Sequence, residues 1–88
     1  MTLEEAKNLK KNQVIYYRGL EDFPEKVTVS DIRMNQNNRI EVHLADNCYI
    51  PEGDLNYIFL TFDECANDCE RIFKEKLNKL KQMIIKEK

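Results

Sequence analysis

Glycine, proline and long hydrophobic runs are all scarce in this sequence of 88 residues. Two glycines and two prolines exclude a collagen-like or Pro/Gly-rich disordered chain, and isolated glycines cannot form a glycine-rich phosphate loop. No apolar run approaches the roughly 20 residues that a membrane-spanning helix needs, so no membrane partner is expected. With 42% hydrophobic and 34% charged residues, residues 1–88 are expected to form one small globular domain.

Positive charge is not in excess either. The chain has 14 Lys and Arg against 16 Asp and Glu, a formal net charge of −2 and a pI near 5.4, whereas nucleic-acid-binding domains usually exceed a pI of about 9. Residues 61–88 are biased by only one positive charge, with seven basic and six acidic side chains. The composition therefore argues against a nucleic-acid partner, and nucleic-acid binding through the Lys-rich C-terminal helix is the alternative hypothesis.

An odd number of cysteines rules out a complete set of intrachain disulfides. Free thiols suit a reducing compartment, and the acidic N-terminal segment lacks the basic start of a leader peptide, so a cytoplasmic location is expected. Cys65 and Cys69 are spaced i, i+4, as two metal ligands on a helix could be. A structural zinc site needs four ligands, and only Cys48 and His43 could complete the set. His43 is expected to point outward and the cysteine pair inward, so no metal site is expected.

Residues for catalysis are also few. Nucleophilic catalysis needs a base within hydrogen-bonding reach of a cysteine or serine, and the chain has one histidine. The carboxylates of Glu52 and Asp54 could be imagined as an acid and a base, but they fall in a turn where acidic residues are expected for solubility. The sequence therefore predicts a protein that is not an enzyme and that uses no cofactor.

Two capping boxes predict where helices begin. Thr2 with Glu5 begins a short helix over residues 2–11, with Ala6 and Leu9 on its inner face. Thr61 with Glu64 begins a long helix over residues 61–86. Apolar residues recur behind Thr61 at steps of three and four, which indicates one apolar helix face. The residues of this face are Phe62, Cys65, Ala66, Cys69, Ile72, Phe73, Leu77, Leu80, Met83 and Ile84.

Short apolar segments with turns between them fill residues 13–60. Residues 14–17 form a first β-favouring run. Within residues 27–34 the alternation shifts parity by one residue, which predicts a β-bulge or a sharp bend. The run of asparagines and glutamine at residues 35–38 predicts a tight hairpin turn, because Asn tolerates left-handed backbone conformations.

The second part of this region alternates more regularly. Residues 39–45 place Ile40, Val42 and Leu44 on one face, and Asp46 with Asn47 indicates the next turn. Short strands are then expected at residues 48–50 and, after a break, at residues 55–60. Four or five short strands with tight turns predict a small antiparallel barrel, and hence a mainly β fold with helices, of the α+β class.

The order of these segments resembles a group of small proteins from phages and mobile elements of low-GC Gram-positive bacteria. The segments that carry the resemblance are TLEEAKNLK at the start, VIYY in the first strand and FLTFDECANDC at the second helix; that group commonly reads FLT-x-EEA there. This chain has Asn12 and Gln13 where the group usually has a glycine. The resemblance implies an SH3-like barrel with a C-terminal helix and a location in the cytosol of a bacterial host. It implies no activity.

Exposed tyrosines offer a first candidate binding surface. Tyr16, Tyr17 and Tyr49 fall on expected strands, and consecutive Tyr16 and Tyr17 must point to opposite faces. One of them should therefore lie at the rim, where small barrels often hold peptide segments. The alternative is that these tyrosines are half-buried in a small core, as amphipathic Tyr often is.

The length of the second helix offers another candidate surface. A helix over residues 62–86 spans roughly 37 Å, whereas a barrel of strands of five to six residues is only about 20 Å across. Leu77, Leu80, Met83 and Ile84 should therefore extend past the barrel, where they could pack against a second copy or another protein. The alternative is that the N-terminal helix covers them. The sequence predicts a non-enzymatic protein-binding module. The resemblance implies an accessory protein encoded by a phage or mobile element, and inhibition of a host defence protein is one role that it suggests.

Overall fold

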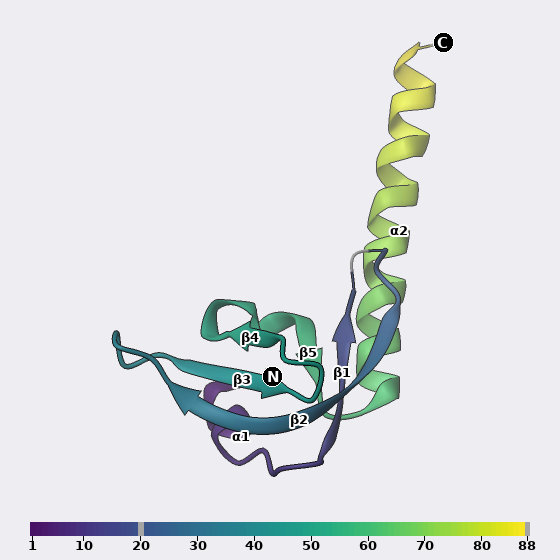
Figure 1. Ribbon diagram of the computed structural model, residues 1–88. Coiled ribbons are helices and arrows are strands. Elements are labelled where there is room, and N and C mark those ends of the chain that lie inside the picture. Colours follow the sequence, from purple (N-terminus) through teal and green to yellow (C-terminus); the bar gives the residue numbers. More distant parts are fainter. Residues whose placement is uncertain (20, 88) are drawn as a thin grey trace.

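The chain folds as an open antiparallel sheet with a long helix at one end (Figure 1). The computed structural model describes residues 1–19 and 21–87. Its elements are α1 (Leu3–Lys7), β1 (Val14–Arg18), β2 (Pro24–Met34), β3 (Ile40–Leu44), β4 (Tyr49–Pro51), the 3-10 helix η1 (Glu52–Tyr57), β5 (Ile58–Phe59) and α2 (Phe62–Glu87). The predicted α+β class, with a short N-terminal and a long C-terminal helix, is confirmed.

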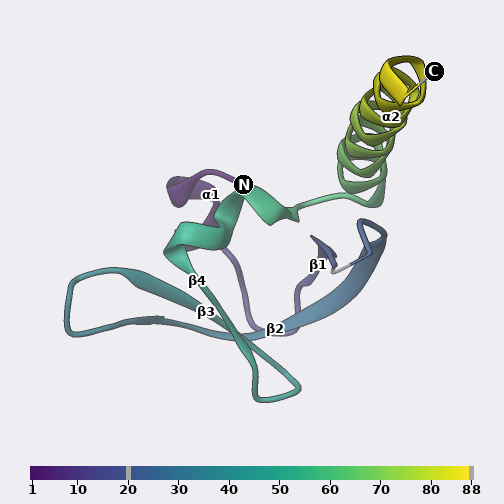
Figure 2. The same cartoon turned by 90° about the horizontal axis from the view of Figure 1, so that it is seen from above.

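The five strands lie in the order β4-β3-β2-β1-β5, and each pairs antiparallel with its neighbours. The long strand β2 belongs to both halves of the sheet and curves between them (Figure 2). Its register shifts between Val29 and Asp31, which confirms the predicted bulge. The sheet is not closed, because β4 and β5 are its two ends. The barrel that the sequence predicted is therefore not confirmed; η1 connects the two ends instead.

Alternation along β3 builds the centre of the core. Ile40, Val42 and Leu44 are buried as predicted, and they pack with Ile15 of β1 and Val29 of β2. The predicted turns on either side of β3 also form, and both use an asparagine with positive φ, Asn38 (60°) and Asn47 (70°). Alternation of this kind fixes which side chains face inward, because a slip of one residue would turn all of them outward.

The N-terminal helix is shorter than expected. It ends at Lys7, not at residue 11, because Asn8 already leaves the helical conformation and Asn12 has a φ of 71°. The capping box of Thr2 and Glu5 forms as predicted. It lowers the pKa of the Glu5 carboxyl, through hydrogen bonds with the Thr2 backbone and side chain. Ala6 and Leu9 are buried as predicted.

The first half of the expected strand over residues 55–60 is part of a 3-10 helix. Only Ile58 and Phe59 pair with β1, while Leu55 belongs to η1. A 3-10 helix has three residues per turn, so Leu55 and Ile58 fall on the same side, and both are buried in the core. The amino group of Met1 donates hydrogen bonds to the carbonyl oxygens of Leu55 (3.0 Å) and Ile58 (2.9 Å). These bonds hold the start of the chain against η1.

The helix α2 gives the molecule its elongated shape. The radius of gyration is 16.0 Å, against about 12 Å for a compact chain of this length, and the longest extent of 53 Å is about twice the other two. The first half of α2 lies beside β1, and the second half extends past the sheet (Figure 1). No helix within the described residues is both long enough and apolar enough to span a membrane.

Candidate protein-docking site

Two buried cysteines anchor the first half of α2. Cys65 is fully buried and Cys69 is 3% exposed, on the side of α2 that packs against β1 and β2. Burial, together with the neighbouring Cys69 thiol, raises the pKa of the Cys65 thiol to about 12. Burial also raises the pKa of the Cys69 thiol. A thiol with a raised pKa is a poor nucleophile at neutral pH, so these two cysteines are packing residues.

Charged groups hold α2 beside this apolar contact. The guanidinium of Arg18 and the carboxylate of Asp68 form an ion pair, with 3.3 Å between Nε and Oδ2 and both side chains less than one-fifth exposed. The Arg18 guanidinium also lies 4.9 Å from the centre of the Tyr57 ring. One helical turn further than Cys69, Ile72 is half-buried, and Lys76 forms an ion pair with Asp22. We call residues 62–76 the anchored half of α2 and residues 77–87 its free half.

An apolar stripe runs along both halves of α2. We use this term for Phe62, Ala66, Cys69, Phe73, Leu77, Leu80 and Ile84. The steps between them are four, three and four residues, repeated twice. This is an 11-residue repeat with a period of 3.67, which keeps the stripe nearly straight along the helix. Five of the seven side chains are 42–53% exposed, namely Phe62, Phe73, Leu77, Leu80 and Ile84.

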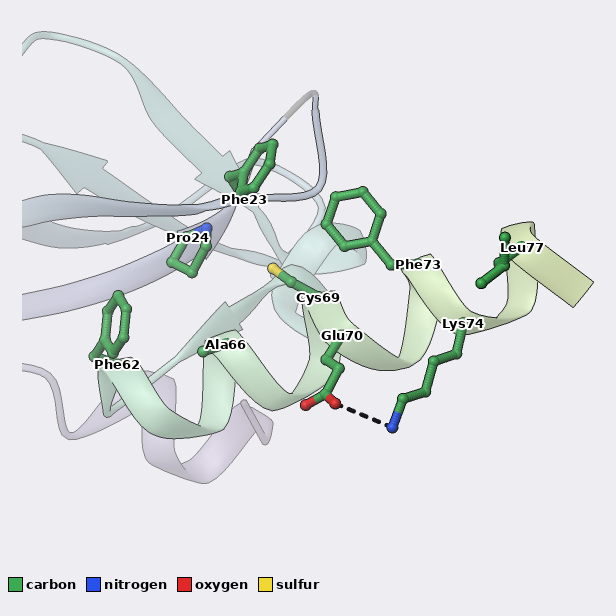
Figure 3. Close-up of a pocket in the computed structure, with 9 residues that line it drawn as sticks. All are labelled: Phe23, Pro24, Phe62, Ala66, Cys69, Glu70, Phe73, Lys74 and Leu77. Atoms are coloured by element: carbon green, nitrogen blue, oxygen red, sulfur yellow. Dashed lines mark ion pairs between the residues drawn. The ribbon is translucent and has the colours of Figure 1, made fainter.

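A shallow groove of about 360 Å³ lies along the anchored part of the stripe (Figure 3). Phe23 and Pro24, at the start of β2, form one wall, and stripe residues from Phe62 to Leu77 form the floor. The rings of Phe23 and Phe73 meet at a centroid distance of 5.3 Å. Glu70 and Lys74 form an ion pair of 3.0 Å at the groove's outer edge, on the side away from Phe23. The groove is therefore apolar inside and charged along one margin.

The free half of α2 lies where the sequence predicted. Leu77, Leu80, Met83 and Ile84 are between 47% and 62% exposed. The alternative prediction, that the N-terminal helix covers them, is wrong. Ala6 of α1 packs into the core of the sheet, and α1 contacts η1, far from the C-terminal end of α2 in both views (Figures 1 and 2).

The three candidate tyrosines do not form one surface. Tyr16 lies under the start of α2, where its ring meets Phe62 edge-on at 5.8 Å. Tyr17 and Tyr49 do share a second depression, of about 270 Å³. Tyr17 is half-buried against the core, whereas Tyr49 is 53% exposed and stacks on His43 at 5.4 Å. Only Tyr17 and Tyr49 are thus brought together, and Tyr16 contributes to the packing of α2.

The remaining candidate ligands are far from a common centre. His43 lies beside Glu41, with 3.0 Å between Nε2 and Oε1, and Cys48 is exposed in the turn before β4, while Cys65 and Cys69 are buried under α2. Across residues 1–19 and 21–87, no group of three or more His, Cys, Asp or Glu side chains is placed to hold a metal ion.

Sequence reasoning missed Phe23 as part of the groove. Phe23 is 57% exposed and falls in a loop that reads as polar, between Asp22 and Pro24. A large aromatic side chain in such a loop was the available signal, since it needs another apolar surface to lean on. The residue it contacts, Phe73, is part of the predicted apolar face but lies 50 positions away in the chain.

Comparison of the chain with protein-family models, with curated proteins and with solved structures found no match. The resemblance to phage and mobile-element proteins therefore stays a prediction that depends on its three sequence segments.

Proposed function

We propose that this protein is a non-enzymatic protein-binding module that docks its partner on the apolar stripe of α2. The observation that carries the proposal is that five side chains of the stripe are each 42–53% exposed. They lie along one face of a helix that is anchored to the sheet only in its first half. A contiguous exposed apolar surface of this kind is typical of an interaction site.

The geometry of α2 suits docking of a helix. A straight stripe at steps of three and four matches the spacing by which amphipathic helices recognise one another or a groove. The anchored half is held by Cys65, Cys69 and the Arg18–Asp68 ion pair, so binding does not have to order it. A surface that is already ordered loses less conformational entropy on binding, which favours affinity.

The resemblance described above extends this proposal to a biological role. A small accessory protein of a phage or mobile element, in the cytosol of a bacterial host, would act by occluding or tethering a host or phage protein through this face. Inhibition of a host defence protein is one role of that type.

Nucleic-acid binding is the second candidate function. One observation favours it: residues 77–87, the end of α2 that extends from the sheet, contain three lysines and one glutamate. The net charge of −2 opposes it. Binding to phosphates weakens steeply with salt, whereas burial of an apolar stripe does not. A complex that survives a rise from 50 to 500 mM salt would therefore rule out this second candidate.

The test of the first candidate compares three chains. Wild type, Leu80→Asp and Ile85→Asp are immobilised, exposed to lysate of the source cells, and the retained proteins are quantified by mass spectrometry. Ile85 is the matched control because it is 73% exposed and lies about 140° from Leu80 around the helix. We expect a protein that wild type and Ile85→Asp retain equally and Leu80→Asp loses. Equal retention of all proteins by the three chains, further copies of this chain included, would contradict the proposal.

A further inference from the structure

The apolar stripe has the same spacing in both directions from Phe73. The steps from Phe73 towards the C-terminus are four, three and four residues, and so are the steps towards the N-terminus. A two-fold axis at Phe73, perpendicular to two antiparallel α2 helices, therefore superimposes one stripe on the other. It places Phe62 opposite Ile84 of the second copy.

The same axis pairs the other stripe residues. Ala66 lies opposite Leu80 of the second copy, and Cys69 lies opposite Leu77. Each of these pairs sets a small side chain against a large one, which is how facing helices interdigitate. Phe73 meets its own copy on the axis, next to Phe23, whose ring it already contacts at 5.3 Å.

We propose that the partner on the apolar stripe is a second copy of this chain, bound antiparallel with the two-fold axis at Phe73. This inference rests on the proposed function, since it names the occupant of the same face. The free half of each α2 then fills the groove beside Phe23 and Pro24 of the other copy. The two sheets lie at opposite ends of the helix pair.

Charge selects the antiparallel orientation. The anchored half, residues 62–76, contains five acidic and three basic side chains, and the free half, residues 77–87, contains three lysines and one glutamate. An antiparallel pair sets the acidic half of each helix beside the basic half of the other. A parallel pair would set like charges together, which is unfavourable.

Individual residues along the outer margin of the groove show the same complementarity of charge. Asp63 and Glu70 are seven residues apart on one flank of α2, and Lys74 and Lys81 follow on the same flank with the same spacing. With the axis at Phe73, Lys81 of the second copy comes within about 3 Å along the helix of the level of Asp63, and Lys74 comes equally near the level of Glu70. Two complementary pairs per chain result.

The first experiment measures mass by light scattering behind size exclusion, from low to high micromolar concentration. We expect wild type and Ile85→Asp to reach twice the 10.5 kDa of one chain, and Leu80→Asp to stay at the mass of one chain. Leu80 is 52% exposed in the free half, so Leu80→Asp should keep the circular dichroism spectrum of wild type. A wild type of one-chain mass at every concentration would overturn the inference.

The second experiment measures orientation, with spin labels on Lys74→Cys and Ile85→Cys in a Cys48→Ser background. In the antiparallel pair, labels at position 74 are offset along the helices by about 3 Å and labels at position 85 by about 36 Å. In a parallel pair both positions give the same short distance, close to the helix separation of about 10 Å. A long distance at position 85 with a short one at position 74 is expected; equal distances would overturn the inference.

Failure of the inference is distinguishable from failure of the proposed function. A one-chain mass together with a lysate protein whose retention depends on Leu80 overturns the second copy as occupant and leaves the protein-binding function standing. A one-chain mass together with equal retention by all three chains contradicts both.

Discussion

The sheet and the free half of α2 contain similar apolar side chains in very different surroundings. Ile15, Val29 and Val42 in the sheet have no exposed surface, whereas every large apolar side chain of residues 77–87 is at least 47% exposed. The two regions nevertheless belong to one chain without a break, since α2 runs from Phe62 to Glu87 as one helix. They differ in which process their apolar residues can contribute to, folding or association.

In the sheet, apolar residues stabilise the fold; in the free half they are left for association. An isolated helix of 11 residues is marginal in water, because nucleation is costly. The free half is helical because it continues a helix whose nucleus the anchored half supplies. Substitutions in the sheet should therefore change the free energy of unfolding, and substitutions in the stripe's free half should change binding.

The largest expected effect on stability is that of Ile15→Ala. Ile15 of β1 is fully buried in the core, and removing three carbon atoms from such a site costs roughly 2–5 kcal/mol. Urea unfolding monitored by circular dichroism measures it. Both this variant and its control are made in the Leu80→Asp background, so that association does not contribute.

The control is Ile85→Ala, the same substitution in the free half. Ile85 is 73% exposed, so the free energy of unfolding should change by less than about 0.5 kcal/mol. Equal losses for the two variants would mean that the free half is as strongly packed as the sheet, contrary to the comparison above.

The next effect is expected at the junction of the two regions, for Asp68→Ala. Asp68 forms an ion pair with Arg18 at 3.3 Å and accepts a hydrogen bond from Arg71 at 2.9 Å, and its loss leaves the largely buried Arg18 guanidinium without its carboxylate. Leaving such a buried donor without its partner costs about 1–3 kcal/mol. Arg33→Ala is the control: it breaks an ion pair with Asp31 in which both side chains are more than half exposed, and exposed pairs contribute about 0–1 kcal/mol.

Much of the fold was predictable because its signals are local. Alternation in β3, the asparagine turns, the parity shift in β2 and both helix starts each depend on a few neighbouring residues, and each fixes a backbone conformation. The limits of α1 and the 3-10 helix η1 were not predictable in this way. They depend on contacts with distant parts of the chain, such as the Met1 amino group with Leu55 and Ile58.

The candidate site likewise has one part that local sequence signals predict and one part that depends on distant contacts. The exposure of Leu80 and its neighbours followed from helix length alone, since a helix of this length extends past any sheet of short strands. The groove did not follow, because Phe23 and Phe73 meet only when the turn between β1 and β2 reaches α2. Closure of the barrel also depends on long-range pairing, and short strands at both ends of the sheet do not specify it.

A smaller effect is expected for Thr61→Ala, at the start of α2. The Thr61 hydroxyl accepts a hydrogen bond from the backbone N–H of Glu64 at 3.2 Å, and loss of such a cap costs about 1 kcal/mol. Thr61→Ser keeps the hydroxyl and is the matched control, with a change of a few tenths of a kcal/mol. The midpoint of urea unfolding checks both. A Thr61→Ala variant as stable as Thr61→Ser would show that this cap does not contribute to the stability of the anchored half.

At neutral pH the effect of Cys65 ionisation is the smallest, because it is absent there. The Cys65 thiol has an ordinary pKa of 9.0 and a folded pKa of about 12 because it is buried. Below pH 9 the thiol is protonated in both states, and stability does not depend on it. Above pH 9 the unfolded chain loses this proton and the folded chain keeps it, so the free energy of unfolding falls as the pH rises from 9 towards 12.

Other groups, including tyrosines and lysines, also titrate there, so the measurement compares urea midpoints of wild type and Cys65→Ala at pH 7.5, 9 and 10.5. The variant should lose less stability than wild type between pH 9 and 10.5. If wild type and Cys65→Ala lose the same stability over this pH range, the folded chain accommodates the Cys65 thiolate between α2 and the sheet. The anchored half is then less tightly packed than the sheet.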